Sequence, residues 1–209
     1  MSTARIDRVV TSGTFSLDGG TWEVENNVWL YGDDDVVAVI DAAHDAAAIL
    51  SAIGGRRVPF IVLTHGHNDH IDAAVELADL TGAPLLLHPD DRMLWDVVHP
   101  SRGPDIDLGD DDELDINGKF HLRVLHTPGH SPGAVCLAGA GVVFSGDTLF
   151  QGGPGATGRS YSDFPTILDS IRERLLVLPG ETRVLTGHGN ETTIGAEAGS
   201  YDDWVVRGH

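Results

Sequence analysis

Short apolar runs, each followed by glycine, proline or charged residues, recur along the chain and predict a succession of strands and helices. The first three runs cover residues 6–15, 27–31 and 36–41. Glycine-containing turns separate them, at residues 19–20 and 32–34. Apolar runs of this length, bounded by turn residues, are typical of strands joined by tight turns. The chain is therefore predicted to open with a β-meander.

Helical spacing begins after this meander. Asp45 precedes the apolar positions 46, 49, 50 and 53, and Gly54-Gly55 follows them. A capping aspartate, apolar residues at i, i+3, i+4 and i+7, and a glycine stop together indicate a helix. Similar patterns predict one helix through Ile71, Ala74, Val75 and Ala78, one with Met93, Leu94 and Val97 inward, and one from Asp163 to Leu175.

Further apolar runs alternate with these helices and complete the pattern of a mixed α/β chain. They lie at residues 60–63, 85–88, 122–125, 134–137, 142–145 and 184–186. Residues 99–119 differ, because they contain prolines, glycines and the acidic run 110–113. A lid over a site is one interpretation of this stretch, and we favour a solvated loop.

Composition limits the class of protein. A chain of 209 residues with 41% apolar content can bury a substantial core, and we expect one domain over residues 1–209. The net charge of −19 argues against a nucleic-acid or membrane partner, because both attract clustered Lys and Arg. A single cysteine, Cys136, and the absence of a long apolar segment favour a cytoplasmic protein.

The stretch from Thr64 to His70 places three imidazoles and a carboxylate in a predicted strand-to-helix turn. His65 and His67 leave the strand on the same side, because side chains alternate with a period of two. Asp69 and His70 then open the helix and provide a second pair. Two ligand pairs on one turn indicate two adjacent ions, and these donors suit zinc while tolerating iron or manganese.

Three more polar residues follow apolar strands beside glycine or proline, namely His130, Asp147 and His188. One such histidine alone would more often be structural. All the sites together provide five imidazoles and two carboxylates, enough for two ions that share a carboxylate and keep positions open for water and substrate. Asp41, at the end of an apolar strand, is a candidate outer partner for a ligating imidazole.

At this point the sequence resembles the metallo-β-lactamase superfamily, whose His-x-His-x-Asp-His motif is matched by residues 65–70. The resemblance implies an αββα sandwich of two mixed β-sheets flanked by helices. It also implies that His65, His67 and His130 hold one metal ion, that Asp69, His70 and His188 hold the second, and that Asp147 bridges them. The segments 146–150 and 187–195 further resemble short bacterial relatives of hydroxyacylglutathione hydrolase, which cleave thioesters.

The implied activity is hydrolysis of a small-molecule thioester by a hydroxide that bridges two divalent ions, with Asp69 and Asp147 as the catalytic carboxylates. Thiolates leave without a strong general acid, and the sequence offers no obvious extra acid. Arg159 and Tyr161, in a glycine-rich stretch after Asp147, are candidates for substrate binding. The longer glutathione-specific enzymes carry an added helical domain that grips glutathione, and this chain stops at His209.

Alternatives remain open. A lactonase would use the same seven ligands, and an iron persulfide dioxygenase of this scaffold would hold one ion with two histidines and an aspartate. A metal-stabilised binding module is the non-enzymatic alternative. A β-lactamase is disfavoured, because a large group of those enzymes has cysteine at the position of Asp147. The histidines at positions 44, 88, 99 and 121 fit surface or capping roles, and His126 is expected outside the site.

Overall fold

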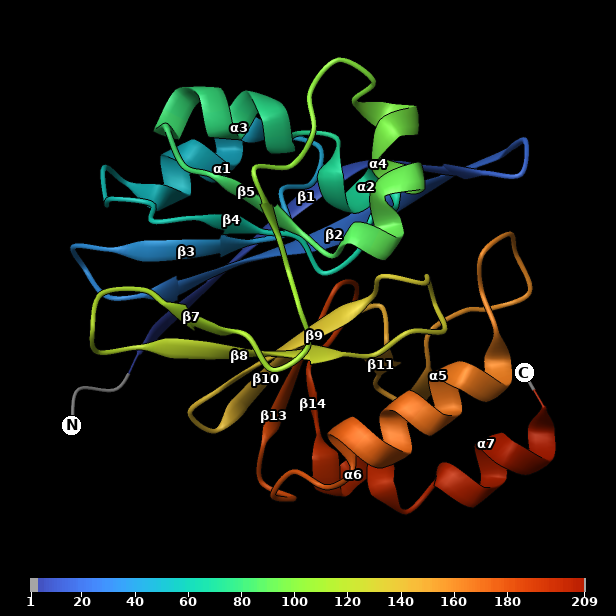
Figure 1. Ribbon diagram of the computed structural model, residues 1–209. Helices are drawn as coiled ribbons and strands as arrows, with labels where there is room; N and C mark the ends of the chain where they lie inside the picture. Colours follow the sequence, from blue (N-terminus) through green and yellow to red (C-terminus); the bar gives the residue numbers. More distant parts are fainter. Residues whose placement is uncertain (1–3, 209) are drawn as a thin grey trace.

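The computed structural model describes residues 4–208, which form four layers (Figure 1). Two six-stranded sheets face each other, and helices cover the outer face of each sheet. Parallel and antiparallel neighbours occur in both sheets. The structure therefore confirms the αββα sandwich of two mixed sheets that the sequence analysis predicted.

The first sheet has the order β1-β2-β3-β4-β5-β6. Its strands are β1 (Arg5–Leu17), β2 (Gly20–Gly32), β3 (Val37–Ile40), β4 (Ile61–Val62), β5 (Leu85–Leu87) and β6 (Ile106–Asp107). The first three strands pair antiparallel as the predicted meander, and the later pairs are parallel. Parallel neighbours need a crossover, which α1 (Ala46–Ile53) provides between β3 and β4 and α3 (Ala74–Thr81) between β4 and β5.

The second sheet has the order β14-β13-β10-β9-β8-β7. Its strands are β7 (Glu113–Asp115), β8 (His121–His126), β9 (Val135–Gly139), β10 (Val142–Gly146), β13 (Arg183–Thr186) and β14 (Thr192–Thr193). Only β10 and β13 pair in parallel among these described strands, and the segment between them carries a helical crossover. That crossover contains the ribbon β11 (Leu149–Phe150) and β12 (Gly153–Pro154), helix α5 (Phe164–Ser170) and the π-helical turn Ile171–Leu175. Helices α6 (Ile194–Ala198) and α7 (Tyr201–Arg207) follow.

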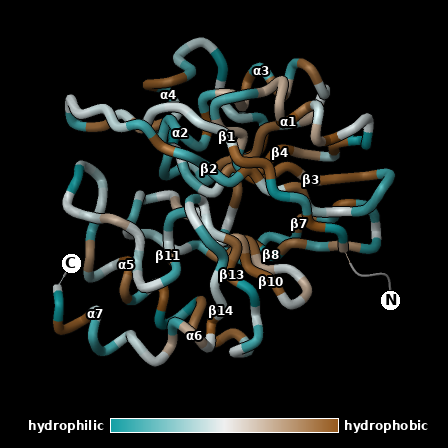
Figure 2. The backbone as a smooth tube through the Cα atoms, turned by 180° about the vertical axis from the view of Figure 1, so that it is seen from behind, coloured by the Kyte–Doolittle hydropathy of each residue, from teal (hydrophilic) through white to brown (hydrophobic). Residues whose placement is uncertain are grey.

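Alternating side chains divide the interior into layers, as β3 illustrates. Val37 and Val39 pack into the core under α1 and α3, whereas Ala38 and Ile40 pack between the two sheets. A strand buried on both faces reads as a continuous apolar run, because each face contacts a different core. The most apolar segments accordingly gather in the central strands, including β3, β4, β8 and β10 (Figure 2).

The predicted helix through residues 71–78 is interrupted in the structure. Helix α2 (Asn68–Ile71) ends before Asp72, and α3 begins only at Ala74. Between them the Ala73 amide donates to the Ala42 carbonyl, and the Ala42 amide donates to the His70 carbonyl. The chain leaves the helix here because its backbone groups bond to the segment that follows β3. Apolar spacing alone gives no indication of this tertiary pairing.

Two more predictions are corrected. Helix α4 (Arg92–Val98), which follows the 3₁₀ turn Pro89–Asp91, buries Leu94 and Trp95, while Met93 and Val97 are exposed. Residues 99–119, interpreted as a solvated loop, contain the edge strands β6 and β7. Both residues of β6 are exposed, so no alternation marks it in the sequence. Among residues 4–208 no helix has the length and apolar character to cross a membrane.

Candidate metal centre

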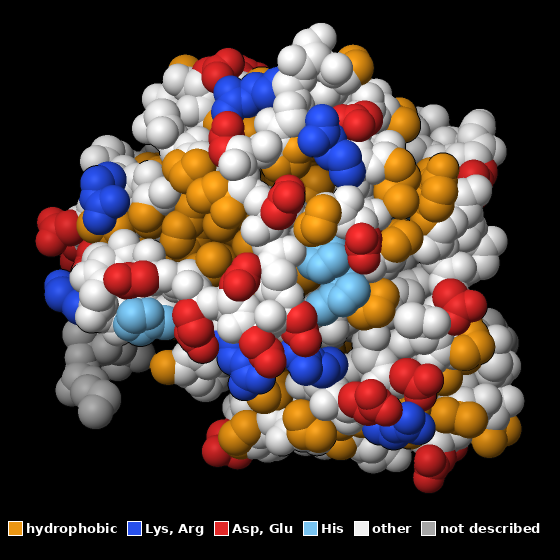
Figure 3. All heavy atoms as spheres, viewed as in Figure 1, with side chains coloured by type: hydrophobic (Ala, Val, Ile, Leu, Met, Phe, Trp, Pro, Cys, Tyr) orange, Lys and Arg blue, Asp and Glu red, His pale blue; other side chains and the backbone are white. Residues whose placement is uncertain are grey.

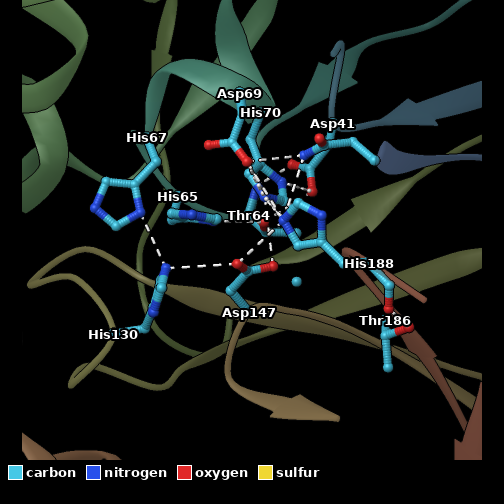
Figure 4. Close-up of polar contacts among 12 residues, drawn as sticks. Asp41, Thr64, His65, His67, Asp69, His70, His130, Asp147, Thr186 and His188 are labelled. Carbon is cyan, nitrogen blue, oxygen red and sulfur yellow. Dashed lines mark hydrogen bonds and ion pairs between the residues drawn. The ribbon is translucent and has the colours of Figure 1, made fainter. Parts of the chain in front are cut away.

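The seven predicted residues come from both sheets and meet at one edge (Figure 4). His65 and His67 follow β4, and Asp69 and His70 lie in α2. His130 stands in the loop between β8 and β9, Asp147 follows β10, and His188 follows β13. The predicted convergence of distant strand ends is therefore observed for all seven side chains.

Their donor atoms form overlapping groups in which all atoms lie within 4.8 Å of one another. The groups are His65, His67 and His130; His65, His70 and Asp147; and Asp69, His70 and His188. Asp147 lies between the outer two groups. Its Oδ2 is 3.6 Å from His130 Nε2 and 3.4 Å from His188 Nε2, while its Oδ1 is 3.4 Å from His70 Nε2. Asp147 is therefore within reach of histidines from both outer groups.

Unsatisfied polar atoms in this site fit a pair of cations. Four buried atoms, on His65, His67, Asp69 and Asp147, have no hydrogen-bond partner among the described residues. A buried polar atom without a partner costs about 1–3 kcal/mol. The His67 and His130 rings also bring two nitrogens within 3.0 Å, and those of His70 and His188 bring two within 3.2 Å. Imidazole and carboxylate donors arranged in this way suit divalent ions such as zinc or iron.

Three of the imidazoles have one ring nitrogen fixed by a carboxylate or carbonyl oxygen outside the cluster. His70 Nδ1 lies 2.9 Å from Asp41 Oδ2, His130 Nδ1 2.9 Å from the Ala156 carbonyl, and His188 Nδ1 2.7 Å from the Glu25 carbonyl. Carboxylate and carbonyl oxygens only accept, so each Nδ1 is the donor, and each Nε2 can offer its lone pair to a metal ion once it carries no proton. These contacts orient the rings for metal binding.

Asp41 holds more than one part of this edge together. Its Oδ1 accepts the Thr64 amide at 2.7 Å, and its Oδ2 accepts the Thr64 hydroxyl at 2.9 Å as well as His70 Nδ1. Asp41 adopts φ of 57°, a left-handed conformation that Asp tolerates better than most residues. The contact between Asp41 and an imidazole of the motif, predicted from its position at a strand end, is present.

Asp91 is a further contributor that the sequence analysis missed. This carboxylate is fully buried and accepts from the Gly66 amide at 2.7 Å, the Ser131 hydroxyl at 2.7 Å and the Gly133 amide at 2.6 Å. Burial raises its pKa, and these three hydrogen bonds oppose that shift. Asp91 thereby ties the turn containing His65 and His67 to the loop containing His130. An acidic residue at a helix start is ordinarily a solvent-exposed cap, so its local sequence did not reveal this role.

Two glycines permit this close approach of strand ends. A Cβ at Gly187 would lie 2.3 Å from Asp147 Oδ1 and 2.7 Å from His70 Cε1. Gly146 adopts φ of 47°, and a Cβ there would lie 2.4 Å from Thr64 Oγ1. Any larger residue at either position would push the carboxylate and the motif apart.

The two ends of the site differ in protonation. Burial, together with the neighbouring rings, lowers the pKa of His65 well below its usual range and that of His67 to about 3. Burial also acts on His188, but Asp147 and Asp69 outweigh it and raise its pKa to about 10. His70 is likewise raised well above its ordinary value by its carboxylate neighbours, against the effect of burial. Without metal, the neutral forms of His65 and His67 are therefore favoured, whereas Asp69 and Asp147 favour protonation of the His70–His188 pair.

Two cavities border His67. One, of about 230 Å³, is lined by His67, Met93, Leu94, Tyr161 and others, and a smaller one of about 40 Å³ reaches His67, His130 and Arg159. The Arg159 guanidinium stacks on Trp22 at 3.9 Å. Tyr161 is half exposed and adopts φ of 71°. Both candidate substrate residues thus line space next to the histidine cluster.

Other histidines have the following surroundings. His126 stacks on His88 with ring centroids 4.1 Å apart, and neither belongs to the seven-residue site. His88 accepts the Asp90 amide as a capping group, and His121 is exposed. His99 bonds to the Ile71 carbonyl. His44, interpreted as a surface or capping residue, instead has a side chain only 4% exposed that contacts Asn26 and Asp72.

Comparisons with known proteins agree with this geometry. Residues 21–188 match the sequence model of the metallo-beta-lactamase superfamily. The chain is 32% identical over 191 residues to hydroxyacylglutathione hydrolase GloC of Haemophilus influenzae, covering 83% of this chain and 89% of that protein. It is similar to the crystal structure of the B3 metallo-beta-lactamase BLEG-1, with TM-score 0.77, 32% identity and coverage of 90% and 97%. It is also similar to TTHA1623 in a di-iron-bound form, with TM-score 0.73, 33% identity and coverage of 84% and 93%.

Proposed function

Since this chain belongs to the metallo-beta-lactamase superfamily, whose members include metal-dependent hydrolases, we propose that it hydrolyses a thioester of a small thiol at a site for two metal ions. The observation that carries this proposal is the position of Asp147 between the two histidine groups. Bound divalent ions would supply a hydroxide nucleophile at neutral pH and polarise the acyl oxygen.

The assignment of ligands follows the groups of donor atoms. His65, His67 and His130 would hold the first ion, Asp69, His70 and His188 the second, and Asp147 both. Zinc suits this set, and the di-iron neighbour supports iron as an occupant. Asp147 and Asp69 would orient the attacking water between the two groups.

No protein nucleophile is needed for this reaction. Cys136 is buried, burial raises its pKa to about 11, and its sulfur contacts the Thr127 hydroxyl. A thiol held in that state is a poor nucleophile. Asp91, a fully buried carboxyl close to the motif, is held by three hydrogen bonds between the motif turn and the His130 loop and is not placed to protonate a leaving group. A thiolate leaving group suits such a site, because it departs without a strong acid.

Substrate size and charge are also constrained. Arg159 and Tyr161 line the cavities beside His67 and would contact the substrate there, with the guanidinium attracting an acidic group. On the face drawn in Figure 3, acidic side chains are scattered around smaller groups of Lys and Arg, in keeping with the net charge of −19. This surface would repel a polyanion, which supports a small-molecule substrate over a nucleic acid.

The test combines metal analysis with a substrate panel. Purified protein would be loaded separately with zinc, iron and manganese, its ions counted by elemental analysis, and assayed on thioesters of several small thiols. Lactones and β-lactams serve as controls, the latter because of the similarity to BLEG-1. We expect two ions per chain and the highest turnover on a thioester. Preferential hydrolysis of lactones would favour a lactonase, and a single iron with oxygen consumption would favour a persulfide dioxygenase.

A further inference from the structure

A chain of polar side chains outside the seven residues leads away from Asp69. Asn26, on β2, is fully buried, and its Nδ2 donates to Asp69 Oδ2 at 3.1 Å. On its other side, Asn26 Oδ1 lies 2.9 Å from His44 Nε2. His44 Nδ1 in turn lies 2.9 Å from Asp72 Oδ2, and Asp72 Oδ1 accepts the His44 amide at 2.6 Å.

Donor and acceptor roles along this chain follow from chemistry. A carboxylate only accepts, so the Asn26 amide nitrogen faces Asp69 and its oxygen faces His44. The oxygen also only accepts, so His44 Nε2 carries a proton. Asp72 is a second acceptor at the other ring nitrogen. His44 therefore lies between an amide oxygen and a carboxylate.

The backbone conformation and packing of His44 hold its ring in one place. The residue adopts φ of 63°, a conformation uncommon for residues other than glycine. Its ring lies against the backbone of β1 at Gly13, where a Cβ would come within 2.2 Å of Nδ1. Strained backbone of this kind persists only when its surroundings impose it, and such residues gather at functional sites.

We propose that Asn26, His44 and Asp72 are positioning residues that hold Asp69 for the second metal ion. This inference rests on the proposed two-ion site. Asp41 fixes His70 and the Glu25 carbonyl fixes His188, so the second ion would have outer support on all three of its own ligands. Outer partners of metal ligands typically contribute 10–100-fold in metal affinity or activity. These three side chains would act by orienting the Asp69 carboxylate, and they would contact neither metal nor substrate.

His44→Gly is the most informative variant, because glycine accepts the backbone conformation at this position. Asn26→Ala interrupts the same chain next to Asp69. Affinities for both ions would be measured by competition with a chelator, and the Co²⁺-substituted protein would report the second site by its visible absorption. The exposed His121→Ala is a matched control that removes an imidazole far from the chain.

We expect each variant to lower the affinity for the second ion by about 10–100-fold and to leave the affinity for the first ion unchanged. The visible spectrum of the cobalt-substituted protein should also change. The double variant should lose little more than either single one, because both break the same chain. Combination with Asp41→Asn should give additive losses.

The outcomes separate this inference from the proposed function. Variants that bind both ions like the wild type, while only their thermal unfolding temperature falls, overturn the positioning role. A wild-type chain that binds a single ion also overturns it, together with the two-ion site. A chain that binds two ions but cleaves no thioester overturns the proposed substrate alone, and the metal affinities still decide the role of His44.

Discussion

The two ends of the candidate site, one around His65 and His67 and the other around His70 and His188, differ in the pKa of their imidazoles. At one end, His65 and His67 are buried and neutral, with their pKa values lowered by burial and by neighbouring rings. At the other end, Asp69 and Asp147 favour protonation of the His70–His188 pair. The first end therefore carries no positive charge of its own. At the second end, protons on the imidazoles supply the positive charge that neutralises the carboxylates.

This contrast implies that two ions at this edge would bind with different dependences on pH. A neutral imidazole binds metal without releasing a proton, but a protonated one must first lose it. The carboxylates that stabilise these protons would also stabilise a metal ion. Outer hydrogen bonds are denser at the second end, where Asp41 and Asn26 each reach a member of the group. We infer that the first ion binds more readily and that the second is the more sensitive to pH and to outer substitutions.

The largest expected effect comes from Asp147→Ala, which would abolish the contrast by removing the residue common to both ends. We expect loss of bound metal and a fall in activity of more than about 100-fold, beyond the range of an outer partner, while the sheets stay folded. Metal content, turnover and circular dichroism measure this. Asp169→Ala, which changes an exposed side chain of α5, is the control. Full activity in Asp147→Ala would refute the bridging assignment.

A change in pH should sharpen the contrast next. Raising the pH removes protons from His70 and His188, so affinity for the second ion should increase with pH until about pH 10, the pKa of His188. Each proton released on binding would steepen that dependence by about 10-fold per pH unit. Affinity for the first ion should stay nearly constant above neutrality. Calorimetry in buffers of different ionisation enthalpy counts the released protons, and equal counts for both ions would contradict this difference.

A smaller effect is expected from Asp41→Asn. Asparagine also tolerates the left-handed backbone at this position, so the fold should be kept. The neutral amide accepts less strongly from His70 and Thr64, and the second ion should bind about 10–100-fold more weakly. Isothermal titration with zinc would measure this, with Asp45→Asn at the cap of α1 as the control. An equal loss at both ions would show that Asp41 supports the whole edge and not its second end.

Local patterns predicted much of the fold because each depended on neighbours in the chain. The cap at Asp45 and the stop at Gly54 are present, with the Asp45 carboxylate accepting the Ala48 amide and Gly54 left-handed. The meander and the strands before the polar residues are present too. The helices after residue 193 were not predicted, since α6 and α7 are short and their packing depends on Trp204 against the second sheet.

By itself the sequence determined the composition of the candidate site: the motif at residues 65–70 and the polar residues after three later strands, because strand ends present side chains at a sheet edge. The tertiary structure decided what surrounds them. Direct contacts with the site come from Asp91 and Asn26, across 25 and 43 positions of the chain, and His44 and Asp72 are linked to it through Asn26. No local periodicity records such contacts. Protonation was decided in the same way, because a pKa depends on burial and on charges that only folding brings together.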